Sequence, residues 1–414
     1  MYRISQTYGV PVQTIIDSNG LRDPDSLVVG QAVVVPGDFF NYTVRNGQSM
    51  YSIARSFGIS LEALMQANPQ LMNPNRLHVG QTIIIPLAPE PERIIEINGF
   101  VFPSVPDEVL QNTLPSMTYL SVFSYQVRPD GGLKGLDDAN AIQTARQVGT
   151  APLMVITNIE EGSGFNSELV HTILTDRQAQ SILIENVIGV LQGNDYDGLI
   201  IDFEYIFPED KQDFVDFIDR VVKRLQPMGY PVMVALAPKT SANQRGLLYE
   251  AHDYAAIGAL ADRVILMTYE WGYLRGPAQA VAPINQVRKV LDYATSVIPS
   301  EKILMGMPNY GYDWTLPFVR GSSARPLSNN GAVLLAKKVG ANIRFDPVAQ
   351  SPYFNYYDSD GSRHEVWFDD ARSIQARLEL VDSYDLAGVS YWTTNNYFAP
   401  NWVVLDSMYQ VRKV

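Results

Sequence analysis

An eight-residue stretch, Asp197-Gly-Leu-Ile-Ile-Asp-Phe-Glu204, restricts the possible fold of this chain most strongly. Successive side chains of a β-strand point to opposite faces, so apolar side chains occupy both faces of this stretch. A strand that is apolar on both faces is buried on both sides, as in a parallel sheet. Asp202 and Glu204 share one face with Ile200 and lie about 6–7 Å apart along it. Because a core does not accept unpaired acids, the two carboxylates indicate either a functional site at the end of the strand or partners elsewhere in the chain.

Similar apolar stretches recur along residues 94–414, and helical stretches separate them. This alternation is expected of α/β folds, and eight strands suit a (β/α)8 TIM barrel. Between the last two strands, a pattern with an Asp360-Gly361 turn is typical of a hairpin, so we predict a small α+β insertion at about 315–372. The eight expected strands are Ile94–Phe102, Tyr119–Tyr125, Leu153–Ile159, Gly198–Glu204, Val232–Ala237, Val264–Tyr269, Ile303–Pro308 and Ala387–Trp392.

The N-terminal part of the chain contains two copies of one pattern. Leu27-Val-Val-Gly-Gln-Ala-Val-Val-Val-Pro36 is echoed by Leu77-His-Val-Gly-Gln-Thr-Ile-Ile-Ile-Pro86. A repeat of this kind indicates two copies of one small structural unit. Each copy predicts a βααβ module, over residues 1–36 and 41–86, and the first lacks its opening strand and turn. A Pro- and Glu-rich linker at 87–93 is expected to join these modules to the barrel.

The composition disfavours several functions. The net charge of −13 argues against binding to nucleic acid or to an anionic membrane surface. The chain has no cysteine, and its four histidines are scattered without the spacing of metal ligands. We therefore expect no metal site, and we also expect no cofactor and a monomer. The first residues do not resemble a signal peptide and no apolar stretch has membrane-spanning length, so we expect no export by the general pathway.

Short motifs with carboxylate, tyrosine and tryptophan side chains stand at or after the ends of expected strands. Barrel active sites lie at the C-terminal ends of the strands, so these side chains are expected to converge although they are far apart in sequence. Together the motifs resemble glycoside hydrolase family 18, the chitinase family, over about residues 94–414. The motifs are Asp197-Gly198-x-x-x-Asp202-x-Glu204, Met267-Thr-Tyr269-Glu270, Met307-Pro-Asn-Tyr310-Gly311 and Gly388-Val-Ser-Tyr-Trp392.

The resemblance implies a retaining glycosidase in which the acetamido group of the substrate is the nucleophile, a recognised exception to the use of two carboxylates. Glu204 would be the general acid, and the charge of Asp202 would raise its pKa so that a proton is available near neutral pH. Asp202 would also hold the acetamido N–H, Tyr269 would donate a hydrogen bond to the acetamido oxygen, and Trp392 would stack against the sugar ring. Further substrate-binding candidates, from the motifs or from their place at strand ends, are Glu270, Met267, Asn158 and Tyr125, and Asp197 and Gly198 are expected to support the motif.

The N-terminal repeats resemble the LysM module, which binds glycans that contain N-acetylglucosamine. LysM modules in front of a family 18 barrel are similar to bacterial spore-cortex-lytic N-acetylglucosaminidases. The combination implies a glycosidase that cleaves peptidoglycan after N-acetylglucosamine and is located in the spore cortex or coat, or in the cell wall. The residues expected to bind glycan in the second module are Gly47, Gln48, Ser49, Asn68 and Pro69.

Three departures from the family pattern leave alternatives open. Ile200 stands where a further Asp is usual, Glu270 stands where an Asp usually follows the tyrosine, and Ile156-Thr-Asn158 stands where many chitinases carry Ser-x-Gly-Gly. The alternatives are a chitinase or chitooligosaccharide hydrolase, and a non-catalytic glycan-binding protein of the spore coat or cell wall. The presence of Glu204 favours an enzyme, because inactive relatives commonly lack this acid.

Overall fold

The computed structural model describes residues 1–37, 39–69, 71, 77–86, 91–160, 162 and 164–414. Its centre is a closed barrel of parallel strands in the order β3-β4-β6-β9-β10-β11-β12-β18, in which β18 pairs back to β3. The expected (β/α)8 barrel is therefore confirmed, and every expected strand is present. The strands are β3 (Ile94–Val101), β4 (Tyr119–Val127), β6 (Ala151–Thr157), β9 (Gly198–Asp202), β10 (Val232–Leu236), β11 (Arg263–Leu266), β12 (Ile303–Pro308) and β18 (Gly388–Trp392).

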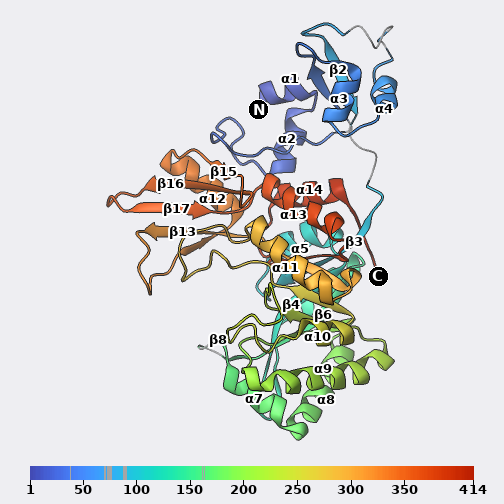
Figure 1. Ribbon diagram of the computed structural model, residues 1–414, viewed down its shortest axis with the longest axis vertical. Coiled ribbons are helices and arrows are strands. Elements are labelled where there is room, and N and C mark those ends of the chain that lie inside the picture. Colours follow the sequence, from blue (N-terminus) through green and yellow to red (C-terminus); the bar gives the residue numbers. More distant parts are fainter. Residues whose placement is uncertain (38, 70, 72–76, 87–90, 161, 163) are drawn as a thin grey trace.

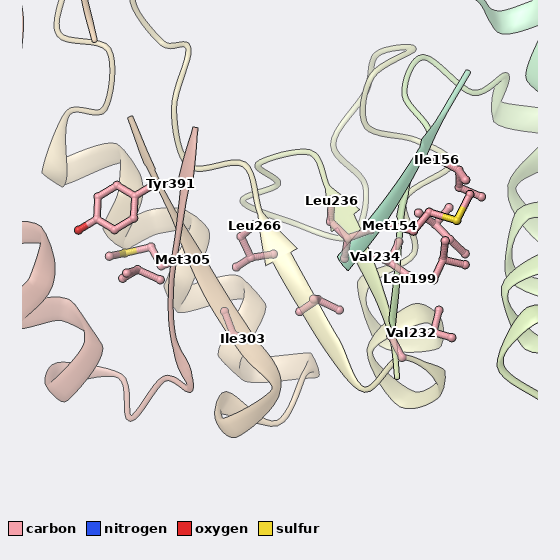
Figure 2. Close-up of a cluster of buried hydrophobic side chains, with 14 of the residues drawn as sticks. Met154, Ile156, Leu199, Val232, Val234, Leu236, Leu266, Ile303, Met305 and Tyr391 are labelled. Atoms are coloured by element: carbon pink, nitrogen blue, oxygen red, sulfur yellow. The ribbon is translucent and has the colours of Figure 1, made fainter. Parts of the chain in front are cut away.

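The barrel strands are apolar on both faces because each lies between the barrel interior and an outer layer of helices. Side chains such as Leu199 and Val234 point outward and belong to the large core under the helices, part of which Figure 2 shows. Their chain neighbours Ile200 and Met233 belong to a separate buried cluster that fills the barrel. The same alternation turns Asp202, two residues after Ile200, toward the barrel axis.

Amphipathic helices form the outer layer. In α9 the buried residues recur every three or four positions, among them Phe214, Phe217 and Val221, as expected for a helix with one apolar face. In the part of the chain that the structure describes, no helix is long and apolar enough to cross a membrane. The helices around the barrel are α5 (Asp107–Thr113), α6 (Ala139–Gln147), α7 (Ser167–Thr175), α8 (Arg177–Gly193), α9 (Lys211–Leu225), α10 (Tyr254–Leu260), α11 (Ile284–Val297), α13 (Ala371–Ser383) and α14 (Ala399–Met408), and short strands occur at β5 (Leu133–Lys134), β7 (Ile159–Glu160), β8 (Gly164–Phe165) and β19 (Gln410–Val411).

A second sheet lies between β12 and β18, where the sequence predicts an insertion (orange in Figure 1). It is antiparallel in the order β14-β13-β17-β16-β15, and a small apolar core around Phe354 and Val366 joins it to α12 (Asn329–Val339). The expected hairpin is formed by β16 and β17, and Gly361 in its turn has a φ of 84°. The strands are β13 (Gly311–Leu316), β14 (Arg325–Leu327), β15 (Arg344–Asp346), β16 (Ser351–Tyr357) and β17 (Arg363–Trp367).

The N-terminal repeats form two small units above the barrel in Figure 1. The second repeat has the expected strand-helix-helix-strand order, with β1 antiparallel to β2. In the first repeat both helices are present, but residues 32–36 form no strand because none of residues 1–37 forms a strand beside them. Residues 87–90 of the predicted linker lie outside the described residues. The elements are α1 (Tyr2–Tyr8), α2 (Val12–Asn19), β1 (Phe39–Thr43), α3 (Met50–Ser56), α4 (Leu61–Gln66) and β2 (Thr82–Pro86).

Candidate active site

The end of strand β9 differs from the sequence prediction. The predicted strand continues to Glu204, but β9 ends at Asp202, which forms the last pair with Thr157 of β6. Asp202 is 5% exposed, and the preceding residue on the same face, Ile200, is fully buried. The Asp202 carboxylate therefore adjoins an apolar barrel interior, and its Oδ1 atom accepts no hydrogen bond from any residue that the structure describes.

Asn158 holds the backbone of Glu204 just beyond the sheet. Its Oδ1 accepts a hydrogen bond from the Glu204 N–H at 2.9 Å, and its Nδ2 donates to the Glu204 carbonyl oxygen at 2.8 Å. Because Asn158 directly follows β6, these bonds replace the ladder bonds that a longer β6–β9 pair would make. Asn158 is fully buried. This position contradicts the prediction that it contacts substrate, and shows instead that it positions the backbone of the expected acid.

A cavity of about 800 Å³ at the C-terminal ends of the strands brings together six of the expected residues. Its volume lies within the range of small-molecule sites. Over the described residues, no group of three or more His, Asp or Glu side chains is arranged to hold a metal ion. The expected residues that line the cavity are Asp202, Glu204, Met267, Tyr269, Glu270 and Trp392.

Aromatic rings form one wall of the cavity around Trp392. Phe100 and Phe123 also line the cavity, and their rings contact the Trp392 ring edge to face at centroid distances of 5.5 and 4.8 Å. Packing of this geometry is favourable for aromatic pairs and fixes the orientation of the indole. Trp392 therefore presents a firmly held apolar surface on which a sugar ring can stack.

Tyr269 has room beside β12 because Gly306 has no side chain. A Cβ atom added at Gly306 would lie 2.8 Å from Cε1 of the Tyr269 ring, closer than real contacts of this kind. The next residue, Glu270, has a φ of 68°, a left-handed conformation that costs a non-glycine residue about 1–3 kcal/mol. Its carboxylate accepts hydrogen bonds from the hydroxyl groups of Tyr310 and Tyr312, the latter at 3.0 Å. Glu270 is thus held in place by the first strand of the insertion and the residue before it.

The carboxyl groups of the cavity have raised pKa values. Burial raises the pKa of Asp202 to about 7. Burial also raises the pKa of Glu204 well above its usual range, and the negative charges of Asp202 and Glu270 raise it further. Partial desolvation by the surrounding protein raises the pKa of Glu270, although the hydrogen bonds from the two tyrosines oppose this change. Among these carboxyl groups, Glu204 is thus best suited to hold a proton at neutral pH, as a general acid must.

We expect Glu270→Gln to move the alkaline limb of the pH profile of kcat/KM to lower pH. Glu204 is the expected general acid, and a general acid is active in its protonated form, so we expect this limb to report loss of the Glu204 proton. Glutamine removes a negative charge that raises the pKa of Glu204, so the proton is lost at lower pH. The matched control is Tyr312→Phe, which removes one of the two tyrosine hydrogen bonds to the Glu270 carboxylate and leaves the carboxyl group itself in place, so any shift of the limb should be smaller than in Glu270→Gln. If the limb stays in place or moves to higher pH in Glu270→Gln, the charge of Glu270 does not act on Glu204.

Tyr125 does not reach the cavity. The pairing of β4 with β6 shifts register between Val122 and Tyr125, so the alternation of faces is broken there. Phe123 stays with the residues inside the barrel, whereas Tyr125 joins the core under the helices. Its hydroxyl group donates a hydrogen bond to the buried carboxylate of Asp138 at 2.5 Å. The prediction that Tyr125 binds substrate is therefore contradicted, and the reason is a bulge that the sequence pattern does not reveal.

The motif residues at the start of β9 lie outside the cavity lining. Asp197 forms an ion pair with Arg146, with 2.7 Å between Oδ2 and Nη1. A Cβ atom added at Gly198 would lie 2.8 Å from the carbonyl oxygen of Pro231, so only glycine allows β9 and the chain before β10 to come this close.

The residues expected to bind glycan in the second repeat differ in their exposure to solvent and in their hydrogen bonds. Asn68 is 2% exposed, and its side chain accepts a hydrogen bond from the Ile84 N–H at 2.7 Å and donates to the Ile84 carbonyl oxygen. This buried backbone clamp contradicts a direct contact of Asn68 with glycan. Ser49 caps α3, because its Oγ accepts a hydrogen bond from the Ser52 N–H at 3.1 Å. Glycan binding stays a prediction for the exposed or partly exposed residues Gly47, Gln48, Ser49 and Pro69.

Much of the cavity wall was not predicted from the sequence. Loops that follow β9, β10 and β11 supply most of it, and their residues have no regular spacing. Tyr205, which directly follows Glu204, has a φ of 54° and shares the left-handed conformation of Glu270. The rule that loops after barrel strands build the site indicates these segments but not individual residues in them. The aromatic residues missed in these loops include Tyr205, Tyr249, Trp271 and Tyr273, and the prediction also missed Phe100 on β3 and Phe123 on β4.

Comparison with known proteins gives relatives for both parts of the chain. Residues 116–396 match Glycosyl hydrolases family 18, and residues 1–36 and 42–86 match the LysM domain. The cortical fragment-lytic enzyme of Bacillus anthracis is 39% identical, with 100% of this chain and 97% of that protein aligned. That of Bacillus subtilis is also 39% identical, with 90% of this chain and 98% of that protein aligned. The crystal structure of the spore cortex-lytic enzyme SleL from Bacillus megaterium has a TM-score of 0.91 at 38% identity and covers 100% of this chain and 96% of its own.

Proposed function

This chain belongs to glycosyl hydrolase family 18 and carries LysM domains, and from this premise we propose that it hydrolyses spore-cortex peptidoglycan at the bond that follows N-acetylglucosamine. Relatives aligned over almost their whole length are named for the lysis of cortex or of its fragments. The observation that carries the proposal is the presence of Glu204, Asp202, Tyr269 and Trp392 in one cavity, although three separate parts of the chain supply them.

In the first step the acetamido oxygen of the substrate attacks the anomeric carbon while Glu204 gives its proton to the glycosidic oxygen. The bond to the leaving sugar breaks, and the attacking oxygen closes an oxazolinium ring. The raised pKa of Glu204 supports this role. The buried Oδ1 of Asp202 accepts no hydrogen bond from the described residues, so it suits the acetamido N–H as a partner. Tyr269 would donate its hydroxyl hydrogen to the acetamido oxygen and orient it for attack.

In the second step the Glu204 carboxylate takes a proton from a water molecule, and the oxygen of that water attacks the anomeric carbon from the side that the leaving sugar vacated. The oxazolinium ring opens and the acetamido group is restored. Two displacements on opposite faces retain the configuration of the sugar. Trp392 would support the sugar ring through both steps and limit the access of other water molecules.

This mechanism decides which bond of the cortex can be cut. The sugar on the non-reducing side of the bond must carry a free 2-acetamido group, because that group is the nucleophile. In muramic lactam, a cortex sugar, the corresponding nitrogen is part of the lactam ring. Cleavage after N-acetylglucosamine is therefore open to this enzyme, whereas cleavage after muramic lactam is not.

The LysM domains would bind the same glycan and raise the effective concentration of the catalytic barrel at the cortex. An enzyme bound in this way would act at the spore or the cell wall. We infer that it works there as a monomer, without nucleic acid or membrane as a partner.

The decisive experiment is mass spectrometry of the products of a defined cortex digest. We expect new reducing ends that carry N-acetylglucosamine, and a faster turnover of cortex fragments than of chitin oligosaccharides of equal length. New reducing ends that carry muramic acid or muramic lactam would contradict the proposed bond. Faster turnover of chitin oligosaccharides would make the protein a chitinase, and binding without any product would make it a glycan-binding protein.

A further inference from the structure

The two N-terminal repeats share a local structure but have different surroundings. In each repeat an asparagine at or just after the end of the second helix clamps the closing segment. Asn19 accepts a hydrogen bond from the Val34 N–H at 2.7 Å, as Asn68 does from the Ile84 N–H at 2.7 Å. The first repeat therefore keeps its internal fold, and the differences between the repeats lie in what each one contacts.

The first repeat lies between the second repeat and the catalytic part of the chain (Figure 1). On one side, its helix α1 packs against β1 of the second repeat, where the rings of Tyr8 and Phe40 meet edge to face at a centroid distance of 5.9 Å. On the other side, α2 packs against α14 of the barrel. Val34 contacts the barrel core and Val28 contacts the core of the insertion. The first repeat thus bridges the other two parts.

The segment of residues 26–31, which we call the docking loop, makes backbone contacts with the insertion and α13. The Ile343 N–H donates a hydrogen bond to the Val29 carbonyl oxygen at 2.9 Å. Arg372 donates from Nη2 to the carbonyl oxygen of Gly30 at 3.2 Å. Close by, Lys337 of α12 forms an ion pair with Asp23. These contacts join the first repeat to the catalytic part through both hydrogen bonds and charge.

Gly30 shows how closely the docking loop approaches the insertion. A Cβ atom added at Gly30 would lie 1.9 Å from the carbonyl oxygen of Ile343, a distance that neither backbone could tolerate. The equivalent glycine of the second repeat, Gly80, occupies the same Val-Gly-Gln motif and has the same φ of 85°. No described atom lies within 4 Å of a Cβ added there. The same motif is therefore open in the second repeat and covered by the insertion in the first.

We propose that the first repeat is an intramolecular docking element whose partner is the insertion, and that it holds the second repeat at a fixed position relative to the catalytic cavity. The docking loop binds protein in the first repeat, while the open second repeat is left to bind glycan. This division of roles rests in part on the proposed function, because it assigns glycan binding to the second repeat. The docking itself does not depend on any substrate.

The test compares Gly30→Ala with Gly80→Ala in the full chain. Alanine strains the left-handed backbone equally at both positions, so only the clash with Ile343 differs. Because the chain has no cysteine, spin labels can be placed at Glu62→Cys and Lys289→Cys, which are exposed on α4 and α11. We expect one narrow distance distribution by pulsed electron resonance in the parent and in Gly80→Ala, and a broadened or shifted one in Gly30→Ala. Equal distributions in both alanine variants would overturn the proposal.

A second test exchanges the charges of the Asp23–Lys337 ion pair, so that the proposal can be tested even where Gly30→Ala does not fold. Asp23→Arg should broaden the distance distribution between the spin labels, because it places two cations next to each other in the docking contact. The double variant Asp23→Arg with Lys337→Asp restores an ion pair and should narrow that distribution again. Absence of this rescue would count against the docking. In sedimentation with insoluble peptidoglycan, we expect Gly30→Ala to bind like the parent. Loss of binding in Gly30→Ala with an unchanged distance distribution would show that the first repeat itself binds glycan.

Discussion

Glu204→Gln is expected to lower kcat on cortex fragments by about 10²–10⁴-fold, the contribution typical of a positioned general acid. Glutamine has nearly the same shape as glutamic acid but carries no proton that it can give to the glycosidic oxygen. The buried surroundings that raise the pKa of Glu204 cannot restore this function in an amide. Steady-state release of new reducing ends measures the effect, and binding to insoluble peptidoglycan should remain unchanged.

The control for this prediction is Glu209→Gln, which changes an exposed glutamate in the same βα loop and should leave kcat within a factor of about two of the parent. A second control uses the leaving group. An aryl glycoside with an acidic phenol needs little protonation to depart, so Glu204→Gln should lose less activity on it than on cortex fragments. A Glu204→Gln enzyme that cleaves cortex fragments at close to the parent rate would falsify the assignment of the acid.

The barrel and the centre of its site could be predicted because both depend on regular patterns. Strands that are apolar on both faces identify a parallel sheet, and the carboxyl ends of barrel strands meet at one face. Knowing the strands is therefore enough to bring Asp202, Tyr269 and Trp392 together.

The rest of the site depends on local breaks in those patterns. Counting alternate residues fails at Tyr125, because a shift of register turns its side chain to the outer face. Two asparagine side chains were interpreted as ligands for substrate, yet both bond to backbone groups. Asn158 accepts a hydrogen bond from the Glu204 N–H beyond the end of β9, and Asn68, just after α4, accepts one from the Ile84 N–H. An amide carries one acceptor and two donors, so it can take either role. Only the course of the neighbouring backbone decides between them.

Arg377→Leu is expected to lower the free energy of unfolding by about 3–5 kcal/mol, as is typical when one partner of a buried ion pair is removed. Arg377 is 1% exposed and forms an ion pair with Asp369, the carboxylate of which also accepts a hydrogen bond from Ser373 at 2.9 Å. Its Nη1 donates to the carbonyl oxygen of Ala282 at 3.0 Å. These bonds join α13, which precedes the Trp392 strand, to the segment before α11. Denaturant unfolding measures the loss.

The matched control is Arg224→Leu, which breaks an ion pair with Glu185 whose side chains are 47% and 64% exposed, and should cost about 0–1 kcal/mol. The double variant Arg377→Leu with Asp369→Leu should recover part of the lost stability, because it leaves no unpaired buried charge.

The cost of Arg377→Leu should also depend on pH. Burial raises the pKa of Asp369, and loss of Arg377 removes a charge that opposes this change. An acid with a raised pKa in the folded state destabilises that state as pH increases, so the cost of Arg377→Leu should be larger at mildly alkaline than at mildly acidic pH. If Arg377→Leu costs no more than Arg224→Leu, the buried pair does not hold α13 in place.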